Sequence, residues 1–100
     1  HADLLLVLVD GSSPEAVEQL QAVDEVLESL GANRLPRLTV LNKIDRIEDR
    51  ALLTPLWQVD ARAIAVSVLS GEGLPDLFAA IQGHLSAVEN RVELLLPHTA

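Results

Sequence analysis

Apolar and polar positions come in blocks along this 100-residue chain. The first block, Leu4 to Val9, is apolar at every position, which is typical of a strand covered on both faces of a parallel sheet. Two further apolar blocks, Arg37 to Leu41 and Ala63 to Val66, predict a second and a third strand. Between the first two strands, residues 14–30 carry apolar side chains at helical spacing and therefore predict an amphipathic helix.

Boundary residues support this division of the chain. Ser12, with Glu15 three positions later, has the spacing of a capping box and predicts the start of the first helix. Asp10, at the end of the first strand, is interpreted as a residue that satisfies loop amides rather than as a metal ligand. The single tryptophan, Trp57, is interpreted as a packing residue.

The rest of the chain predicts two more helices and a final extended segment. A short helix is expected to begin near residue 46 and to reach about residue 53. Residues 74–85 have the spacing of an amphipathic helix, and Val92 to Leu96 is expected to be extended. We therefore expect an α/β fold, with a parallel sheet of three strands and flanking helices joined by right-handed crossovers. In the isolated chain, the outer edge of the first strand is expected to be unpaired.

Composition excludes several classes of protein. The net charge is −8 and the pI is near 4.6, so no basic patch for nucleic acid is expected. There are no cysteines, and the three histidines are scattered, so we expect no disulfide and no metal site. No apolar run is long enough for a membrane span, which favours a cytoplasmic protein. The chain has no methionine and is expected to be an interior segment of a longer protein.

The second strand ends in the polar sequence Asn42-Lys43-Ile44-Asp45, at the end of the sheet where α/β proteins bind ligands. The two oxygens of Asp45 can accept from the ring N–H and the exocyclic amine of guanine, a pair of donors that adenine lacks. Asn42 can tie the loop to a neighbour and reach the base, and Lys43 can lay its alkyl stem over the base. The alternative is an ordinary polar loop in which Asp45 lies near a helix start.

A second candidate motif, Ser67-Val68-Leu69, follows the third strand. The backbone N–H of Val68 can bind the carbonyl oxygen of guanine, and the Ser67 hydroxyl can hold the carboxylate of Asp45 in place. Alone, this segment is equally compatible with an ordinary strand-to-helix loop. Together with the polar sequence one βα unit earlier, it predicts a guanine site.

These segments resemble the carboxyl-terminal half of a translation-factor-related GTPase domain, most closely that of HflX-type GTPases. The resemblance covers nearly the whole chain. It is carried by Val9-Asp10, Asn42-Lys43-Ile44-Asp45, Ser67 to Leu74, and Arg91 to Pro97. It implies half of a P-loop GTPase domain, a Rossmann-like three-layer fold, over residues 1–90, and it implies that residues 91–100 begin a following segment or domain.

The resemblance also implies the ligands. Asn42, Lys43 and Asp45 match the family's base-reading motif for GTP or GDP, and Ser67 to Leu69 match its Ser-Ala-Leu. Val68 departs from the usual Ala, which leaves the backbone N–H in place but adds bulk beside the base. Members of the family hydrolyse GTP with Mg²⁺ and act on the large ribosomal subunit, and the same is expected of the intact protein.

The sequence contains no G-x-x-x-x-G-K-[ST] phosphate loop and no strand ending in Asp-x-x-Gly. Catalytic residues and Mg²⁺ ligands are therefore expected outside this chain, which alone is predicted to be inactive. Three alternatives stay open. They are another ribosome-associated GTPase of the Era-like or Obg-like kind, a nucleotide-binding or interaction module without hydrolysis, and a doubly wound domain that binds no nucleotide.

Overall fold

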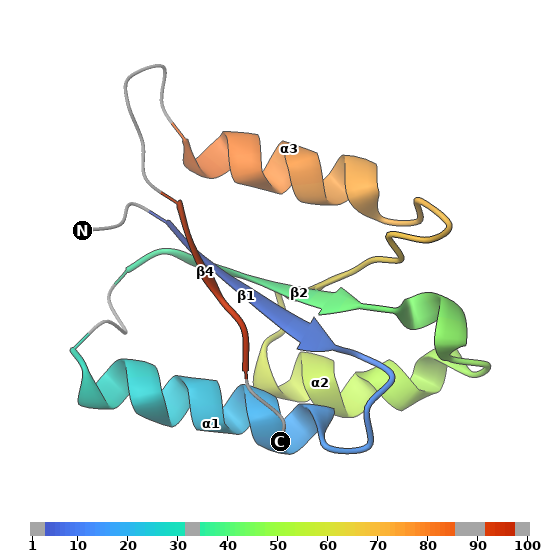
Figure 1. Ribbon diagram of the computed structural model, residues 1–100, viewed down its shortest axis with the longest axis horizontal. Helices are drawn as coiled ribbons and strands as arrows, with labels where there is room; N and C mark the ends of the chain where they lie inside the picture. Colours follow the sequence, from blue (N-terminus) through green and yellow to red (C-terminus); the bar gives the residue numbers. More distant parts are fainter. Residues whose placement is uncertain (1–3, 32–34, 86–91, 98–100) are drawn as a thin grey trace.

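The computed structural model describes residues 4–31, 35–85 and 92–97, and these form a parallel sheet between two layers of helices (Figure 1). The elements, in chain order, are β1 (Leu4–Asp10), α1 (Ala16–Ser29), β2 (Arg37–Asn42), the 3-10 helices η1 (Ile44–Arg46) and η2 (Arg50–Leu53), α2 (Thr54–Val59), β3 (Ile64–Ala65), α3 (Leu74–His84) and β4 (Val92–Leu95). The strand order is β3-β2-β1-β4, and every pairing is parallel. The predicted α/β fold is confirmed.

The unbroken apolar run of β1 is explained by helices on both faces of the sheet. Leu5, Val7 and Val9 pack in a buried cluster with residues of α1 and α2. Leu4 faces the opposite way, into a second cluster that includes Leu77 of α3. Figure 1 shows the same division, with α1 and α2 below the sheet and α3 above it. A strand buried on both sides needs no polar alternation.

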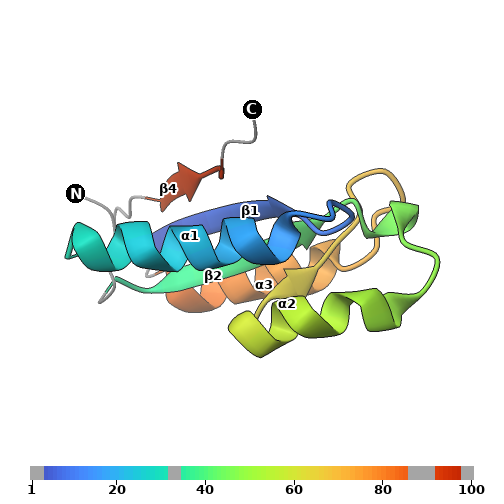
Figure 2. The same cartoon turned by 90° about the horizontal axis from the view of Figure 1, so that it is seen from below.

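The sheet has a fourth strand, which corrects two expectations drawn from the sequence. β4 pairs with β1 in parallel, from Leu4 opposite Val92 to Val7 opposite Leu95, so the outer edge of β1 is not unpaired (Figure 2). The physical reason is that an open edge leaves backbone N–H and C=O groups without partners, and β4 supplies them. The predicted domain boundary between residues 90 and 91 lies outside the described residues.

The predicted capping box at Ser12 is wrong. α1 begins at Ala16, and no side chain caps its first turn. The backbone N–H and the hydroxyl of Ser12 instead donate to Oδ1 of Asp10, at 3.0 and 2.6 Å. Short polar side chains readily form such local bonds in place of a helix cap. The interpretation of Asp10 as a residue that satisfies loop amides is confirmed.

A polar cluster fastens α1 and the end of α2 to β2. Arg37 of β2 donates to Asp24 of α1 and, at 3.2 Å, to Asp60, which directly follows α2. The buried hydroxyl of Thr39 donates to the same Asp60 oxygen at 2.6 Å. Burial acts to raise the pKa of Asp60, but the bonds from Thr39, the Arg62 backbone N–H and Arg37 outweigh it, and the pKa is lowered.

Trp57 contributes to the same side of the fold, as predicted. Its ring packs against the buried cluster between the sheet and helices α1 and α2, and its indole N–H donates to the carbonyl oxygen of Ala63 at 2.8 Å. A partly buried tryptophan whose one polar atom is hydrogen-bonded can pack its ring without leaving that atom unsatisfied. The interpretation of Trp57 as a packing residue is confirmed.

Asp60→Asn is expected to flatten the dependence of the chain's stability on acid. Because the folded pKa of Asp60 lies below its ordinary value of 3.8, the ionised group stabilises the fold at neutral pH, and this contribution is lost as the pH falls through the folded pKa. The variant should lose about 1–3 kcal/mol at pH 7. Urea unfolding from pH 7 to pH 3 measures this, and parallel curves for wild type and variant would contradict it.

Candidate functional site

Because β1, β2 and β3 pair in parallel, their carboxyl ends lie at the same end of the sheet, hereafter called this edge. Figure 1 shows the arrowheads of β1 and β2 there. In the parallel register, Asp10 is paired with Asn42, and Leu41 is paired with Ala65. This register brings together the β1–α1 turn, the Asn42 to Asp45 turn and the turn that follows β3. Two segments of the predicted site, separated by more than twenty residues in sequence, therefore lie side by side.

The turn after β2 is sharp and is held by hydrogen bonds. Lys43 has φ of 64°, in the left-handed region that non-glycine residues seldom adopt. The side-chain oxygen of Asn42 accepts from the Lys43 N–H at 2.8 Å, and the Asn42 carbonyl accepts from the Gly11 N–H at 2.8 Å. These bonds offset the strain at Lys43 and fix the direction in which its side chain leaves the backbone.

Ser67 connects the two predicted motifs. Its side chain is 0% exposed, and its hydroxyl donates to Oδ1 of Asp45 at 2.7 Å. The same oxygen of Ser67 accepts from the Ser70 N–H at 3.0 Å. The predicted contact between Ser67 and Asp45 is thus confirmed. Because Asp45 itself is exposed, this contact orients the carboxylate while leaving it accessible.

Backbone hydrogen bonds join the same two turns. The Ile44 N–H donates to the Val66 carbonyl at 3.2 Å, and the Val66 N–H donates to the Leu41 carbonyl at 2.8 Å. Within the second turn, the Gly71 N–H donates to the Ser67 carbonyl at 2.8 Å. The two turns therefore form one hydrogen-bonded unit, in which a displacement of one turn shifts the other.

Val68 and Leu69 lie at the exposed tip of the second turn. Their side chains are 67% and 86% exposed, so neither contributes to the core. Among the described residues, no hydrogen bond uses the N–H of Val68. Val68 thus carries a backbone donor and an exposed apolar side chain one position after Ser67, the residue that contacts Asp45.

Two ion pairs at this edge were missed by the sequence reasoning. Arg50 of η2 binds Glu72 through two parallel bonds of 2.9 and 2.8 Å, which raise the pKa of Arg50 and lower that of Glu72. The ammonium of Lys43 lies 3.6 Å from Oδ2 of Asp10. Nothing in the sequence around Arg50 or Glu72 indicates that these two residues form an ion pair. The Lys43 contact depends on the register of β1 and β2, which pairs Asp10 with Asn42.

The local charges keep Asp10 ionised. Partial burial acts to raise its pKa, but the two hydrogen bonds from Ser12 and the positive charges of Lys43 and Arg46 act in the opposite direction and leave the pKa lowered. A carboxylate with a lowered pKa carries its negative charge throughout the neutral range. Asp10 is therefore a fixed negative charge beside Lys43.

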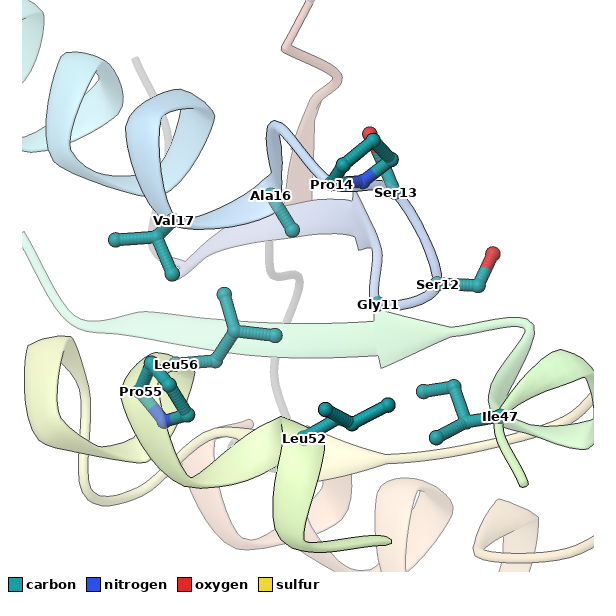
Figure 3. A pocket seen from close by; sticks show the side chains of 10 residues that line it. All are labelled: Gly11, Ser12, Ser13, Pro14, Ala16, Val17, Ile47, Leu52, Pro55 and Leu56. Carbon is teal, nitrogen blue, oxygen red and sulfur yellow. The ribbon is translucent and has the colours of Figure 1, made fainter. Parts of the chain in front are cut away.

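A pocket of about 390 Å³ lies near this edge, on the side of the sheet covered by α1 and α2 (Figure 3). It is lined by Gly11, Ser12, Ser13, Pro14, Ala16, Val17, Ile47, Leu52, Pro55 and Leu56. The lining is mainly apolar and includes none of the six predicted site residues. The pocket therefore lacks the charged acceptor and the cation that the predicted site contains.

Neither a metal cluster nor a membrane helix is found in the described part of the chain. Within it, no three His, Cys, Asp or Glu side chains are grouped as ligands for a metal ion. Among residues 4–31, 35–85 and 92–97, no helix is long and apolar enough to cross a membrane.

A parallel sheet with helices on both faces is consistent with half of a P-loop GTPase domain. No protein-family model matches the chain. Curated proteins do match it. They include GTPase HflX of Akkermansia muciniphila, 38% identical over 98% of this chain and 23% of the relative. GTPase HflX of Escherichia coli is 35% identical over 97% of this chain and 23% of the relative.

A third relative, GTPase HflX of Spirochaeta thermophila, is 42% identical over 80% of this chain and 19% of the relative. The chain thus spans about a fifth to a quarter of the length of the relatives that it matches. Over that span, the chain belongs to the HflX family of GTPases.

Two glycines of the second turn provide a test of how the site is built. Both have positive φ, but a Cβ on Gly73 would lie 2.1 Å from the Ala65 carbonyl oxygen, whereas a Cβ on Gly71 would meet nothing within 4 Å. Gly71→Ala should cost only the backbone penalty of about 1–2 kcal/mol. Gly73→Ala should cost several kcal/mol more, since β3 and α3 must separate.

Urea unfolding of both variants measures the difference. Gly71→Ala is the matched control, because it carries the same substitution in the same turn. Equal losses of stability in the two variants would contradict the close approach of Gly73 to β3.

Proposed function

We propose that this chain recognises the guanine base of GTP or GDP within an intact HflX-type GTPase. The observation that carries the proposal is the hydrogen bond from the buried Ser67 hydroxyl to the exposed carboxylate of Asp45. An acceptor that is held in place before the ligand arrives costs less to order on binding. Asp45 is such an acceptor, at the end of the sheet where α/β domains bind ligands.

Each site residue has a role in this proposal. Asp45 accepts from the ring N–H and the exocyclic amine of guanine, because a carboxylate has about four lone-pair sites and Ser67 uses one. The Val68 N–H donates to the guanine carbonyl oxygen. Asn42 uses its side-chain oxygen on the Lys43 N–H, so its NH₂ group is left to donate to a base acceptor.

Lys43 and Leu69 complete the proposed site. The alkyl stem of Lys43 covers one face of the base, while its ammonium adds positive charge near the nucleotide. Leu69, which is exposed beside Val68, borders the base on the side of the second turn. Both roles depend on the turns that the backbone hydrogen bonds hold together.

GTP hydrolysis is proposed for the intact protein rather than for this chain. The relatives are named GTPases, and the chain spans 23% of two of them. Mg²⁺ would neutralise charge that develops on the phosphates, and the residues that hold it are expected outside this chain. Within the chain, the proposed roles are to bind and orient the base.

The intact protein is further proposed to act on the large ribosomal subunit in the cytoplasm, on the strength of the family resemblance. With a net charge of −8, this chain is unsuited to contact the phosphates of ribosomal RNA directly. The contact surface is therefore placed in other parts of the protein. Co-sedimentation of the full-length protein with isolated large subunits tests this proposal.

Asp45→Asn in the full-length protein should move its preference from GDP towards XDP. The substitution replaces one acceptor oxygen by an NH₂ donor, which opposes the guanine amine but suits the carbonyl that xanthine has there. Loss of one charge-assisted bond costs about 1.5–3 kcal/mol, or roughly 10- to 150-fold in GDP affinity. Equilibrium binding of GDP and XDP at one salt concentration measures the switch.

Glu48→Gln is the matched control for this experiment. It removes one negative charge from the same exposed loop and should leave both affinities unchanged. If the Asp45→Asn variant binds GDP as tightly as the wild type does, Asp45 does not read the base and the proposed function is wrong.

The isolated chain should show no GTP turnover above the uncatalysed background. The sequence lacks a phosphate loop, and charge stabilisation at the phosphates supplies most of the catalysis in phosphoryl transfer. Phosphate release from excess GTP and Mg²⁺ measures turnover. Protein-dependent release by this chain would show that it holds catalytic groups. A full-length protein that binds GDP but never releases phosphate would favour a module without hydrolysis.

A further inference from the structure

We propose that Asp10 is a positioning residue, whose carboxylate holds the Lys43 side chain in the orientation that covers the guanine base. This inference rests on the proposed function, because it assigns to Lys43 the same place over the base. It adds a residue from β1 to a site otherwise built from the turns after β2 and β3.

Asp10 is anchored from one side and contacts Lys43 on the other. Its Oδ1 accepts from the N–H of Ser12 at 3.0 Å and from the Ser12 hydroxyl at 2.6 Å. Its Oδ2 lies 3.6 Å from the Lys43 ammonium. Since Oδ1 is fixed by two bonds to its own turn, Oδ2 is fixed as well, and the Lys43 ammonium meets a negative charge at a defined place.

The backbone brings the two residues together in a fixed relation. Asp10 and Asn42 are partners in the parallel pairing of β1 and β2, and the Gly11 N–H donates to the Asn42 carbonyl at 2.8 Å. A Cβ on Gly11 would lie 3.2 Å from that carbonyl oxygen, so the two turns are in close contact. Lys43 follows directly in a left-handed conformation that sets the direction of its side chain.

Lys43 needs such a constraint. Its side chain is 46% exposed, and an exposed lysine samples many rotamers whose entropy is lost on binding. Asp10, which is 35% exposed at its side chain and ionised at neutral pH, removes part of that freedom before the nucleotide arrives. Less ordering then remains to be done on binding, which raises affinity without adding a contact to the ligand.

Asp10→Asn in the full-length protein tests the proposal. The asparagine oxygen can still accept from Ser12, so the chain should still fold with only a small fall in the thermal midpoint, but the charge facing Lys43 is gone. Because the interaction that is lost is an exposed ion pair, GDP binding should weaken by about two- to fivefold at low salt. The difference from wild type should vanish near 1 M salt, where the screening length is about 3 Å.

Two further variants separate positioning from a general loss of structure. Asp49→Asn is the matched control, because Asp49 also accepts a local backbone bond, from the Ala51 N–H at 2.9 Å, and should leave GDP binding unchanged. Lys43→Gln should weaken binding by itself. In the Lys43→Gln background, Asp10→Asn should have no further effect, because the partner that it positions is absent.

Each outcome decides between the alternatives. An Asp10→Asn effect that is equal in both backgrounds, or that persists at high salt, would overturn the proposal in favour of a structural role. If the Asp10→Asn variant binds GDP as tightly as the wild type does, the proposal is also wrong. The proposed function would still stand in that case, provided that the Asp45→Asn variant changes its preference from GDP to XDP. A wild-type protein that binds ADP as tightly as GDP would instead overturn the proposed function itself.

Discussion

Parallel pairing of β1 with β2 and of β2 with β3 is the constraint on which the candidate site depends. Because the strands run in the same direction, their carboxyl ends lie at the same end of the sheet. The register places Asp10 beside Asn42. The same pairing brings Val66 against Leu41 and so sets Ser67 within reach of Asp45. An antiparallel strand in place of β3 would put Ser67 at the opposite end of the sheet.

Much of this arrangement is predictable from the sequence, because the signals are local. The unbroken apolar run of β1 indicates a strand with helices on both faces, and the two buried clusters confirm it. The polar residues that follow β2 and β3 indicate the end of the sheet where the candidate site lies. The contact between Ser67 and Asp45 was predicted from their roles and is present at 2.7 Å.

The incorrect or missed predictions concern contacts for which several partners in the fold compete. Ser12 has the spacing of a helix cap, but Asp10, two residues earlier, captures both its N–H and its hydroxyl. β4 is a short apolar segment whose pairing with β1 depends on which backbone edge is open, and no local pattern states that. Likewise, the ion pair between Lys43 and Asp10 can be predicted only once the register of β1 and β2 is known.

The central claim is that a carboxylate, held by a buried hydroxyl, reads the donors of guanine. Binding of IDP and GDP to the full-length wild-type protein tests it most directly, because hypoxanthine differs from guanine only in lacking the exocyclic amine. If Asp45 accepts from that amine, GDP should bind about 10- to 150-fold more tightly than IDP, the value of one hydrogen bond to a charged group. Equal affinities for IDP and GDP would contradict the account.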